Sequence, residues 1–284
     1  MFSIMGITGK VGGEIARNLL AAHKAVRGVV RDPGRAQVWP RQGCELVAAD
    51  IHDAMSLTAA FQETEGVFLL VPPSFDPLPK FPEAHAIAAS LRAALEAAQP
   101  GKAVYLSTIG AQATRENLLS QHTIIEKELR KVELPITFLR PGWFLENCSW
   151  DLAPAKSGRI PSFLQPLDKP VRMVATEDIG RVAAEFLQET WSGHRTVELE
   201  GPRPVSPNEI GTTFAKLLRH SVKVEAVPRE TWESLFKSQG MKNPTPRIQM
   251  LDGFNEGWIE FEGSPQKGIV GLESVLRALI EQQN

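Results

Sequence analysis

The chain has little cysteine, a single tyrosine and no long apolar run. Cys44 and Cys148 are the only thiols in 284 residues, and their wide separation matches neither a disulfide framework nor a metal site. No segment approaches the roughly 18 apolar residues of a transmembrane helix, and the N-terminal residues lack the basic and apolar regions of a signal peptide. We therefore expect a cytoplasmic protein with no membrane partner and no bound metal.

An excess of positive charge is also missing. The sequence has 31 lysine and arginine residues against 33 aspartate and glutamate residues, for a formal net charge of -2. A nucleic acid is therefore not an expected partner, because such binding depends on a basic surface that displaces counterions. Hydrophobic residues make up 43% of the chain, which is typical of a soluble globular protein. A homodimer remains open as a partner.

What the sequence does contain is a regular alternation of apolar strands and amphipathic helices. Strands are expected at residues 2–5, 25–30, 45–49, 66–71, 103–107, 135–140, 197–201 and 222–227. Helices are expected at residues 13–20, 52–62, 83–98, 116–131, 176–188, 206–218 and 272–281. This alternation predicts an α/β fold with a doubly wound parallel sheet, the Rossmann fold.

A glycine-rich turn follows the first strand and opens the first helix. In Gly6-Ile7-Thr8-Gly9-Lys10-Val11-Gly12, glycines permit a tight turn and let backbone N–H groups approach a pyrophosphate at a helix N-terminus. The turn predicts a dinucleotide site formed by Gly6, Thr8, Gly9, Lys10, Val11 and Gly12. The alternative is a turn that serves only the packing of helix on sheet.

The residue after the second strand distinguishes between the two nicotinamide cofactors. An acidic residue there would bind the ribose hydroxyl of NAD, whereas Arg31 favours the 2′-phosphate of NADP(H). Arg31 can alternatively be a solvated loop cation. Asp50, with its neighbour Ile51, follows the third strand and is expected to contact the adenine, although a helix N-cap is nearly as good an interpretation of Asp50. Val71 and Pro72 end the fourth strand, where they border the nicotinamide side or simply terminate the strand.

The catalytic residues of an ordinary short-chain dehydrogenase are absent. Tyr105 lies inside a strand, and no lysine follows four residues later. Ser107 at the end of that strand and His122 on the next helix are the candidates, with His122 and Glu126 on one helical face. His122 would then protonate a reduced substrate near neutral pH, oriented by the carboxylate. The alternatives are that the Ser107 hydroxyl only caps the end of the strand, and that His122 and Glu126 are a surface pair that ties the helix to the small lobe.

Several segments together resemble the NmrA-like group of atypical short-chain dehydrogenases. They are the glycine turn and the stretches Val30-Arg31-Asp32-Pro33, His122-Thr123-Ile124-Ile125-Glu126-Lys127-Glu128-Leu129, Leu139-Arg140-Pro141-Gly142-Trp143-Phe144-Leu145-Glu146-Asn147 and Ala175-Thr176-Glu177-Asp178-Ile179-Gly180. The resemblance covers nearly the whole chain in the same order and spacing. The group includes NADPH-dependent quinone and azo reductases as well as NADP-binding regulators with no known turnover.

The resemblance implies two parts with NADP(H) in the cleft between them. Residues 1–142 would form the NADP-binding Rossmann domain, residues 143–284 a smaller substrate lobe, and 173–200 would return to the first domain. Pro141, with Gly142, would border the nicotinamide. His122 stands where related plant reductases keep a catalytic lysine, and a histidine at this position still permits proton transfer.

Aromatic residues follow the sixth strand at the expected cleft. Trp143, Phe144 and Trp150 would stack on a conjugated substrate, or would form the core of the small lobe. We therefore expect an NADPH-dependent oxidoreductase that transfers hydride to a quinone, enone, imine or azo compound. The alternative is a regulatory protein that senses NADP(H) without turning it over.

Overall fold

The computed structural model describes residues 1–282 and is built around one large sheet of eight strands. They run in the order β12-β10-β6-β5-β4-β1-β2-β3, and every neighbouring pair is parallel. The strands are β1 (Phe2–Met5), β2 (Val26–Val30), β3 (Glu45–Ala48), β4 (Gly66–Leu69), β5 (Ala103–Leu106), β6 (Ile136–Pro141), β10 (His194–Glu200) and β12 (Gln266–Lys267). The chain winds outward from β1 in both directions, which confirms the predicted doubly wound α/β fold.

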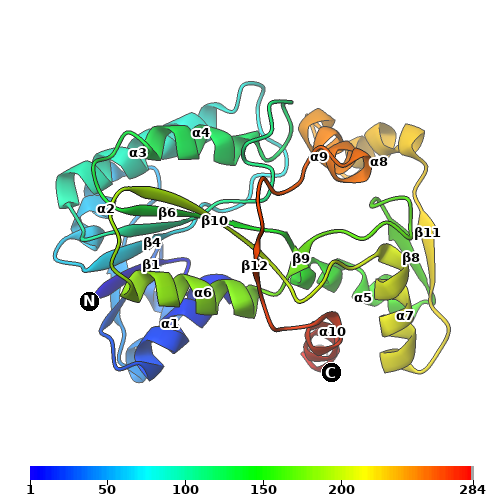
Figure 1. Ribbon diagram of the computed structural model, residues 1–284, viewed down its shortest axis with the longest axis horizontal. Coiled ribbons are helices and arrows are strands. Elements are labelled where there is room, and N and C mark those ends of the chain that lie inside the picture. The colour runs from blue at the N-terminus through cyan, green and yellow to red at the C-terminus, as the bar shows by residue number, and fades with distance from the viewer. Residues whose placement is uncertain (283–284) are drawn as a thin grey trace.

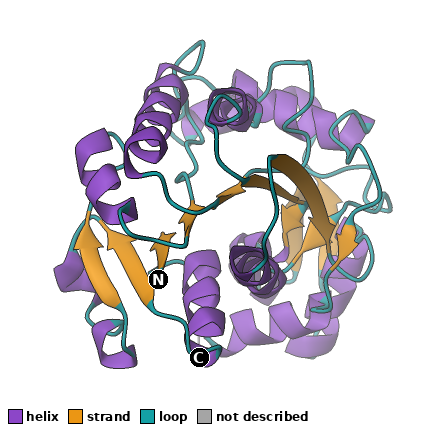
Figure 2. Cartoon of the chain, turned by 60° about the vertical axis from the view of Figure 1, so that its left-hand side comes forward, coloured by secondary structure: helices purple, strands orange, loops and turns teal. Residues whose placement is uncertain are grey.

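Helices cover both faces of this sheet (Figures 1 and 2). One face carries α1 (Lys10–Ala21) and α6 (Thr176–Gln188), and the other carries α2 (Ala54–Phe61), α3 (Pro82–Ala98) and α4 (Ser120–Leu129). Strands β4, β5 and β6 are buried at every position. The apolar sequences of β4 and β5 follow from this arrangement, because a parallel strand covered on both faces has no polar side; in β6, the buried polar residues Thr137 and Arg140 have hydrogen-bond partners instead.

The remaining elements form a smaller lobe beside the carboxyl edge of the sheet (Figure 1). Its strands are β8 (Arg159–Ser162) and β11 (Lys223–Ala226), which pair in parallel, and a short ladder joins β7 (Trp143–Phe144) to β9 (Met173–Val174). Its helices are α5 (Leu152–Lys156), α7 (Pro207–Leu218), α8 (Trp232–Ser238), α9 (Thr245–Glu256) and α10 (Leu272–Glu281). Short 3-10 segments occur at Pro33–Ala36 and Pro40–Gln42 in the sheet domain and at Leu145–Trp150 and Arg229–Thr231 in the lobe.

Several element boundaries differ from the sequence prediction; for example, α1 begins at Lys10 rather than at residue 13, and β10 begins at His194 rather than at residue 197. Two further differences have a clear local cause. Helix α4 begins at Ser120 rather than at residue 116, because Asn117 accepts a hydrogen bond from the Leu119 N–H and donates one to the Arg115 carbonyl. These bonds hold a turn in place of the first helical turn. Strand β12 was not predicted, because two exposed residues carry no periodic signal.

Within residues 1–282, no helix is long and apolar enough to span a membrane. In the same part of the chain, no three His, Cys, Asp or Glu side chains are grouped so that they could hold a metal ion.

A buried carboxylate fastens the C-terminal segment to the sheet domain. Asp178, in the first turn of α6, is fully buried and accepts hydrogen bonds from the N–H groups of Ile269 (2.9 Å) and Val270 (2.8 Å). Arg181 forms an ion pair with its other oxygen at 3.0 Å. The two N–H groups lie just before α10, so Asp178 links the Rossmann helix α6 to the lobe.

Replacing Asp178 is therefore expected to weaken the whole fold. Asp178→Ala leaves two backbone donors without a partner, and we expect a loss of about 2–4 kcal/mol in the free energy of unfolding. Urea denaturation would measure it. Glu177→Ala, at the exposed neighbouring position, is the control and should change stability by less than about 0.5 kcal/mol. Equal effects of the two substitutions would contradict this role of Asp178.

Candidate active site

The glycine turn between β1 and α1 is shaped by close backbone contacts. Gly6 has a φ of +68°, and its carbonyl accepts a hydrogen bond from the Gly9 N–H at 2.9 Å. A Cβ atom added to Gly12 would lie 2.3 Å from the Gly6 carbonyl oxygen. Any side chain at Gly12 would therefore push α1 away from the turn.

The N-terminus of α1 opens to solvent at this turn. Thr8, Gly9 and Lys10 are exposed, and Gly9 caps the helix without any side-chain hydrogen bond. The free N–H groups and the helix dipole together favour an anion at this point. The Val11 side chain is different, since it is 5% exposed and packs in the core. Its contribution to a ligand site is limited to its backbone.

Arg31 lies beside the turn because of the strand register. Met5 of β1 pairs with Val29 of β2, so the chain after β2 emerges next to Gly6. The Arg31 side chain is exposed and forms no ion pair with any residue in 1–282. The neighbouring Asp32 carboxylate instead accepts a hydrogen bond from the Gly34 N–H at 2.9 Å. The guanidinium of Arg31 thus remains available to an anion.

Asp50 follows β3 at the same edge, but it is not the cap of the next helix. Its Oδ1 accepts a hydrogen bond from the His52 N–H at 2.9 Å, while Asp53 caps α2 through the Met55 N–H at 3.0 Å. The alternative interpretation of Asp50 as the N-cap is therefore wrong. Ile51 is half-buried against the core under α2 and α3.

Three further predicted residues lie at the carboxyl ends of β4 and β6. Val71 is half-buried and Pro72 is exposed just beyond β4. Pro141 is buried at the end of β6, where its carbonyl accepts a hydrogen bond from the Ile109 N–H at 2.8 Å. Ligands of open α/β sheets bind outside this edge.

Glu126 and Arg140 form a buried ion pair near the carboxyl edge of the sheet. Glu126 of α4 accepts hydrogen bonds from Arg140 of β6 at 2.8 and 2.9 Å and from the Ser107 hydroxyl at 2.6 Å. Burial raises the pKa of Glu126, but the Arg140 and Ser107 hydrogen bonds outweigh burial and the pKa is lowered. Ser107 is 3% exposed, and its hydroxyl is engaged by Glu126. Because the Ser107 hydroxyl donates its hydrogen bond to Glu126, it is not free to donate one to a substrate or to the nicotinamide.

His122 is held by tyrosine rather than by Glu126. Its Nδ1 lies 2.7 Å from the hydroxyl of Tyr105, a side chain that is fully buried. Burial lowers the pKa of His122 to about 4, against a smaller opposing effect of Glu126, and burial raises the pKa of Tyr105. The phenol stays protonated and can donate to Nδ1, and in that arrangement the ring proton lies on Nε2. The lowered pKa favours a neutral ring at neutral pH, and the role of His122 as a proton donor stays a prediction.

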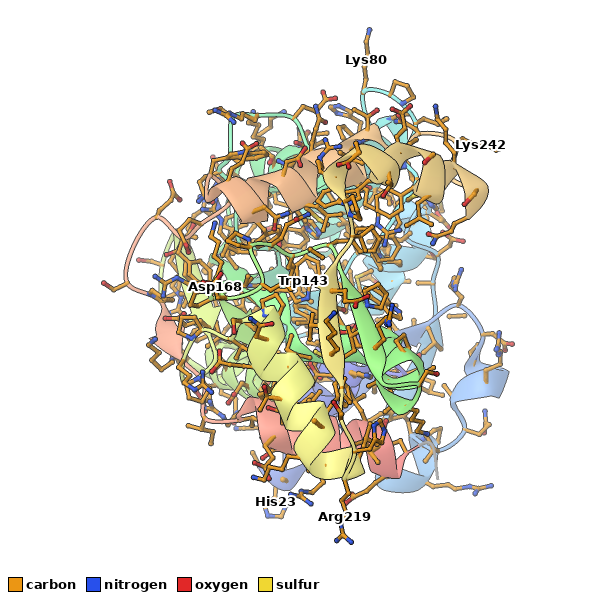
Figure 3. The ribbon with its side chains drawn as sticks, turned by 90° about the vertical axis from the view of Figure 1, so that its right-hand side faces the viewer. His23, Lys80, Trp143, Asp168, Arg219 and Lys242 are labelled. Carbon is orange, nitrogen blue, oxygen red and sulfur yellow. The ribbon has the colours of Figure 1, made fainter. Side chains whose placement is uncertain are left out.

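The three predicted aromatic residues do not share one environment. Trp143 packs edge-on against Phe254 at 5.2 Å between ring centroids, inside the lobe (Figure 3). Phe144 points to the other side of its strand and packs against the sheet core. Trp150 is 59% exposed and lies 6.2 Å from the ring of Phe75. Trp150 lines an open pocket of about 460 Å³.

Sequence reasoning missed an acidic group next to Trp150. Asp151 is half-buried, and its carboxyl group has no hydrogen-bond partner among residues 1–282. Burial raises its pKa to about 7. Neither a motif nor periodicity marks Asp151, since the shift depends on how α5 packs. Groups with such shifts gather at functional sites.

The fold is that of a nucleotide-binding α/β protein with an adjoining smaller lobe. The model of the NmrA-like family matches residues 2–260. The chain belongs to the NmrA-like family, as its motifs predicted.

Its relatives include several reductases. The chain is 23% identical over 259 residues to NAD(P)H azoreductase of Xenophilus azovorans, which covers 90% of this chain and 85% of that protein. It is 25% identical to quinone oxidoreductase 2 of Escherichia coli over 85% of this chain and 82% of that protein. Triphenylmethane reductase of Citrobacter sp. has a similar structure, with a TM-score of 0.82, 20% identity and 99% of each chain covered.

The Asp151 carboxyl group should make stability depend on pH. Its pKa is raised in the folded state, so the folded protein binds more protons than the unfolded chain between about pH 4 and pH 7, and stability falls as the pH rises through that window. Asp151→Asn should remove this loss and stabilise the protein by about 1–3 kcal/mol at pH 8, and by less at pH 5.

Urea denaturation at pH 5 and at pH 8 would measure the difference. Asp168→Asn is the control, because Asp168 is an exposed residue of the same lobe (Figure 3). A gain that is the same at both pH values would mean that Asp151 ionises normally in the folded protein.

Proposed function

We propose that this protein is an NADPH-dependent reductase that transfers hydride to a conjugated small molecule such as a quinone, enone, imine or azo compound. The observation that carries the proposal is the open glycine turn with the unpaired Arg31 beside it. Family membership and the reductases among the relatives support it. A cytoplasmic location agrees with the composition and stays a prediction.

The turn fits the pyrophosphate of a dinucleotide. A side chain at Gly12 would fill the space below the turn, and the bare N-terminus of α1 offers donors above it. Arg31 would bind the 2′-phosphate, and the Asp50 carboxylate would lie towards the adenine. Val71, Pro72 and Pro141 would border the nicotinamide. Bound NADPH would supply the hydride, so the protein need only align the acceptor and exclude water.

His122 would then act as a neutral hydrogen-bond donor to the acceptor. Tyr105 fixes the ring through Nδ1, so that the Nε2 proton can polarise a carbonyl or azo group. The proton that completes the reduction would come from solvent or from Asp151, whose carboxyl group titrates near neutral pH. The division of the chain into a cofactor domain at 1–142 with 173–200 and a substrate lobe at 143–284 belongs to this proposal.

Turnover itself can be tested by following NADPH absorbance with a panel of quinones, enones and azo dyes. We expect oxidation of NADPH with at least one acceptor, and reduced product in equal amount.

His122→Ala should lower kcat about 10-fold or more and leave NADPH binding unchanged, because it removes a donor from the reacting group. Tight NADPH binding with no oxidation by any acceptor would favour the regulatory alternative.

The cofactor preference depends on Arg31. Arg31→Asp should raise the Kd of NADPH about 10- to 100-fold, because a charge-assisted hydrogen bond to the phosphate is replaced by repulsion. The Kd of NADH should change by less than about 3-fold, since NADH carries no such phosphate. Titrations monitored by fluorescence would give both constants. Equal loss for both cofactors would remove Arg31 from phosphate binding.

A further inference from the structure

An open pocket lies between the loop after β4 and the smaller lobe. Its lining residues are Phe75, Asp76, Trp150, Gln239, Gly240, Met241 and Arg247. Phe75 comes four residues after Val71, and Gln121, the neighbour of His122, donates a hydrogen bond to the Ser74 carbonyl at 3.0 Å. The pocket therefore continues from the edge where the nicotinamide is proposed to lie.

Arg247 is unusual among the arginines of this chain. Its guanidinium carbon lies 4.4 Å from the ring centre of Phe236 and 5.9 Å from that of Phe75, and Nη1 contacts the Met241 sulfur at 3.8 Å. Within residues 1–282 it forms no ion pair. Burial lowers its pKa, whereas the pKa of each other arginine with a resolved shift is raised by carboxylate partners. A positive charge is thus partly desolvated without a counterion.

The acidic residue of the pocket does not neutralise Arg247. The two oxygens of Asp76 accept hydrogen bonds from the N–H groups of Lys242 (2.9 Å) and Asn243 (2.7 Å). Asp76 thereby ties the loop after β4 to the lobe, and Lys80 and Lys242 mark the two sides of that junction in Figure 3. Its carboxylate is turned to the backbone of the lobe rather than to Arg247.

We propose that this pocket binds a flat aromatic acceptor that carries a carboxylate or sulfonate group. Phe75 and Trp150 would hold the rings by apolar contact, and Arg247 would bind the anionic group. A guanidinium binds such oxyanions through two parallel hydrogen bonds, and it gains most where water is already partly removed. This inference rests on the proposed reductase function, because it names the substrate class for the same site.

The test compares 1,2-naphthoquinone with its 4-sulfonate as acceptors at saturating NADPH. Arg247→Gln should lower kcat/KM for the sulfonate about 10- to 100-fold, mainly through KM, and change the value for the neutral quinone by less than about 3-fold. Arg247→Lys should recover part of the loss. Comparing the ratio of the two kcat/KM values between wild type and variant cancels the difference in the intrinsic reactivity of the two quinones.

Arg229→Gln is the matched control, because Arg229 also lies over an aromatic ring of the lobe, that of Trp232, but is paired with Asp252. It should leave the substrate ratio unchanged. An equal loss for both quinones in Arg247→Gln would overturn the proposal and leave Arg247 as a packing residue. The same holds if Arg229→Gln shifts the ratio as strongly as Arg247→Gln does.

A binding experiment separates this inference from the reductase function. Naphthalene-2-sulfonate is not reduced by NADPH, and calorimetric titration should show that it binds the wild-type protein at least 10-fold more tightly than it binds Arg247→Gln. Such binding without turnover of any acceptor would refute the reductase proposal and support the pocket. Turnover of quinones with equal sulfonate binding by both proteins would support the reductase and refute the pocket.

Discussion

The buried ion pair between Glu126 and Arg140 sets the geometry on which the candidate site depends. It joins α4 to β6 and, through Ser107, to the end of β5. The Arg140 side chain is 6% exposed and that of Glu126 4% exposed, so removing either partner would break a buried ion pair and leave the other with a single, more exposed partner, Glu262 for Arg140 and Arg130 for Glu126. Because α4 is fixed in this way, His122 and Gln121 on its first turns have defined positions at the carboxyl edge of the sheet.

Further hydrogen bonds connect α4, through the loop after β4, to the lobe. Gln121 holds the loop after β4 at Ser74, and Asp76, two residues on, binds the lobe backbone. On the opposite side, Asp178 of α6 binds the segment before α10. Two aspartates that accept backbone hydrogen bonds thus fasten the lobe to the sheet domain from two sides, and the aromatic pocket lies next to one of these junctions.

The fold was predictable from the sequence to a large extent, because periodicity reports burial directly. The apolar segments of β4 and β5 and the mostly apolar segment of β6 predicted the sheet, and the glycine turn after β1 predicted where the cofactor is proposed to bind. Glu126 was assigned to His122 because both share one helical face. A helical face indicates which residues are neighbours, but not which neighbour on another strand competes for the same carboxylate. Arg140, 14 residues away, is the stronger partner of Glu126.

Asp151 and Arg247 could not be predicted for the same reason, since their properties depend on contacts between segments far apart in the sequence. Nothing in the residues around them differs from an ordinary surface segment, and their properties come from which side chains exclude water in the folded chain. In His122 the consequence is a ring that stays neutral, whereas in Arg247 the charge is retained because guanidinium holds its proton even when partly buried. Burial therefore lowers the pKa at both positions, but only the pKa of the histidine falls below neutral pH. It makes His122 a donor without charge next to the proposed hydride transfer, and it makes Arg247 a cation that gains most from an anionic ligand.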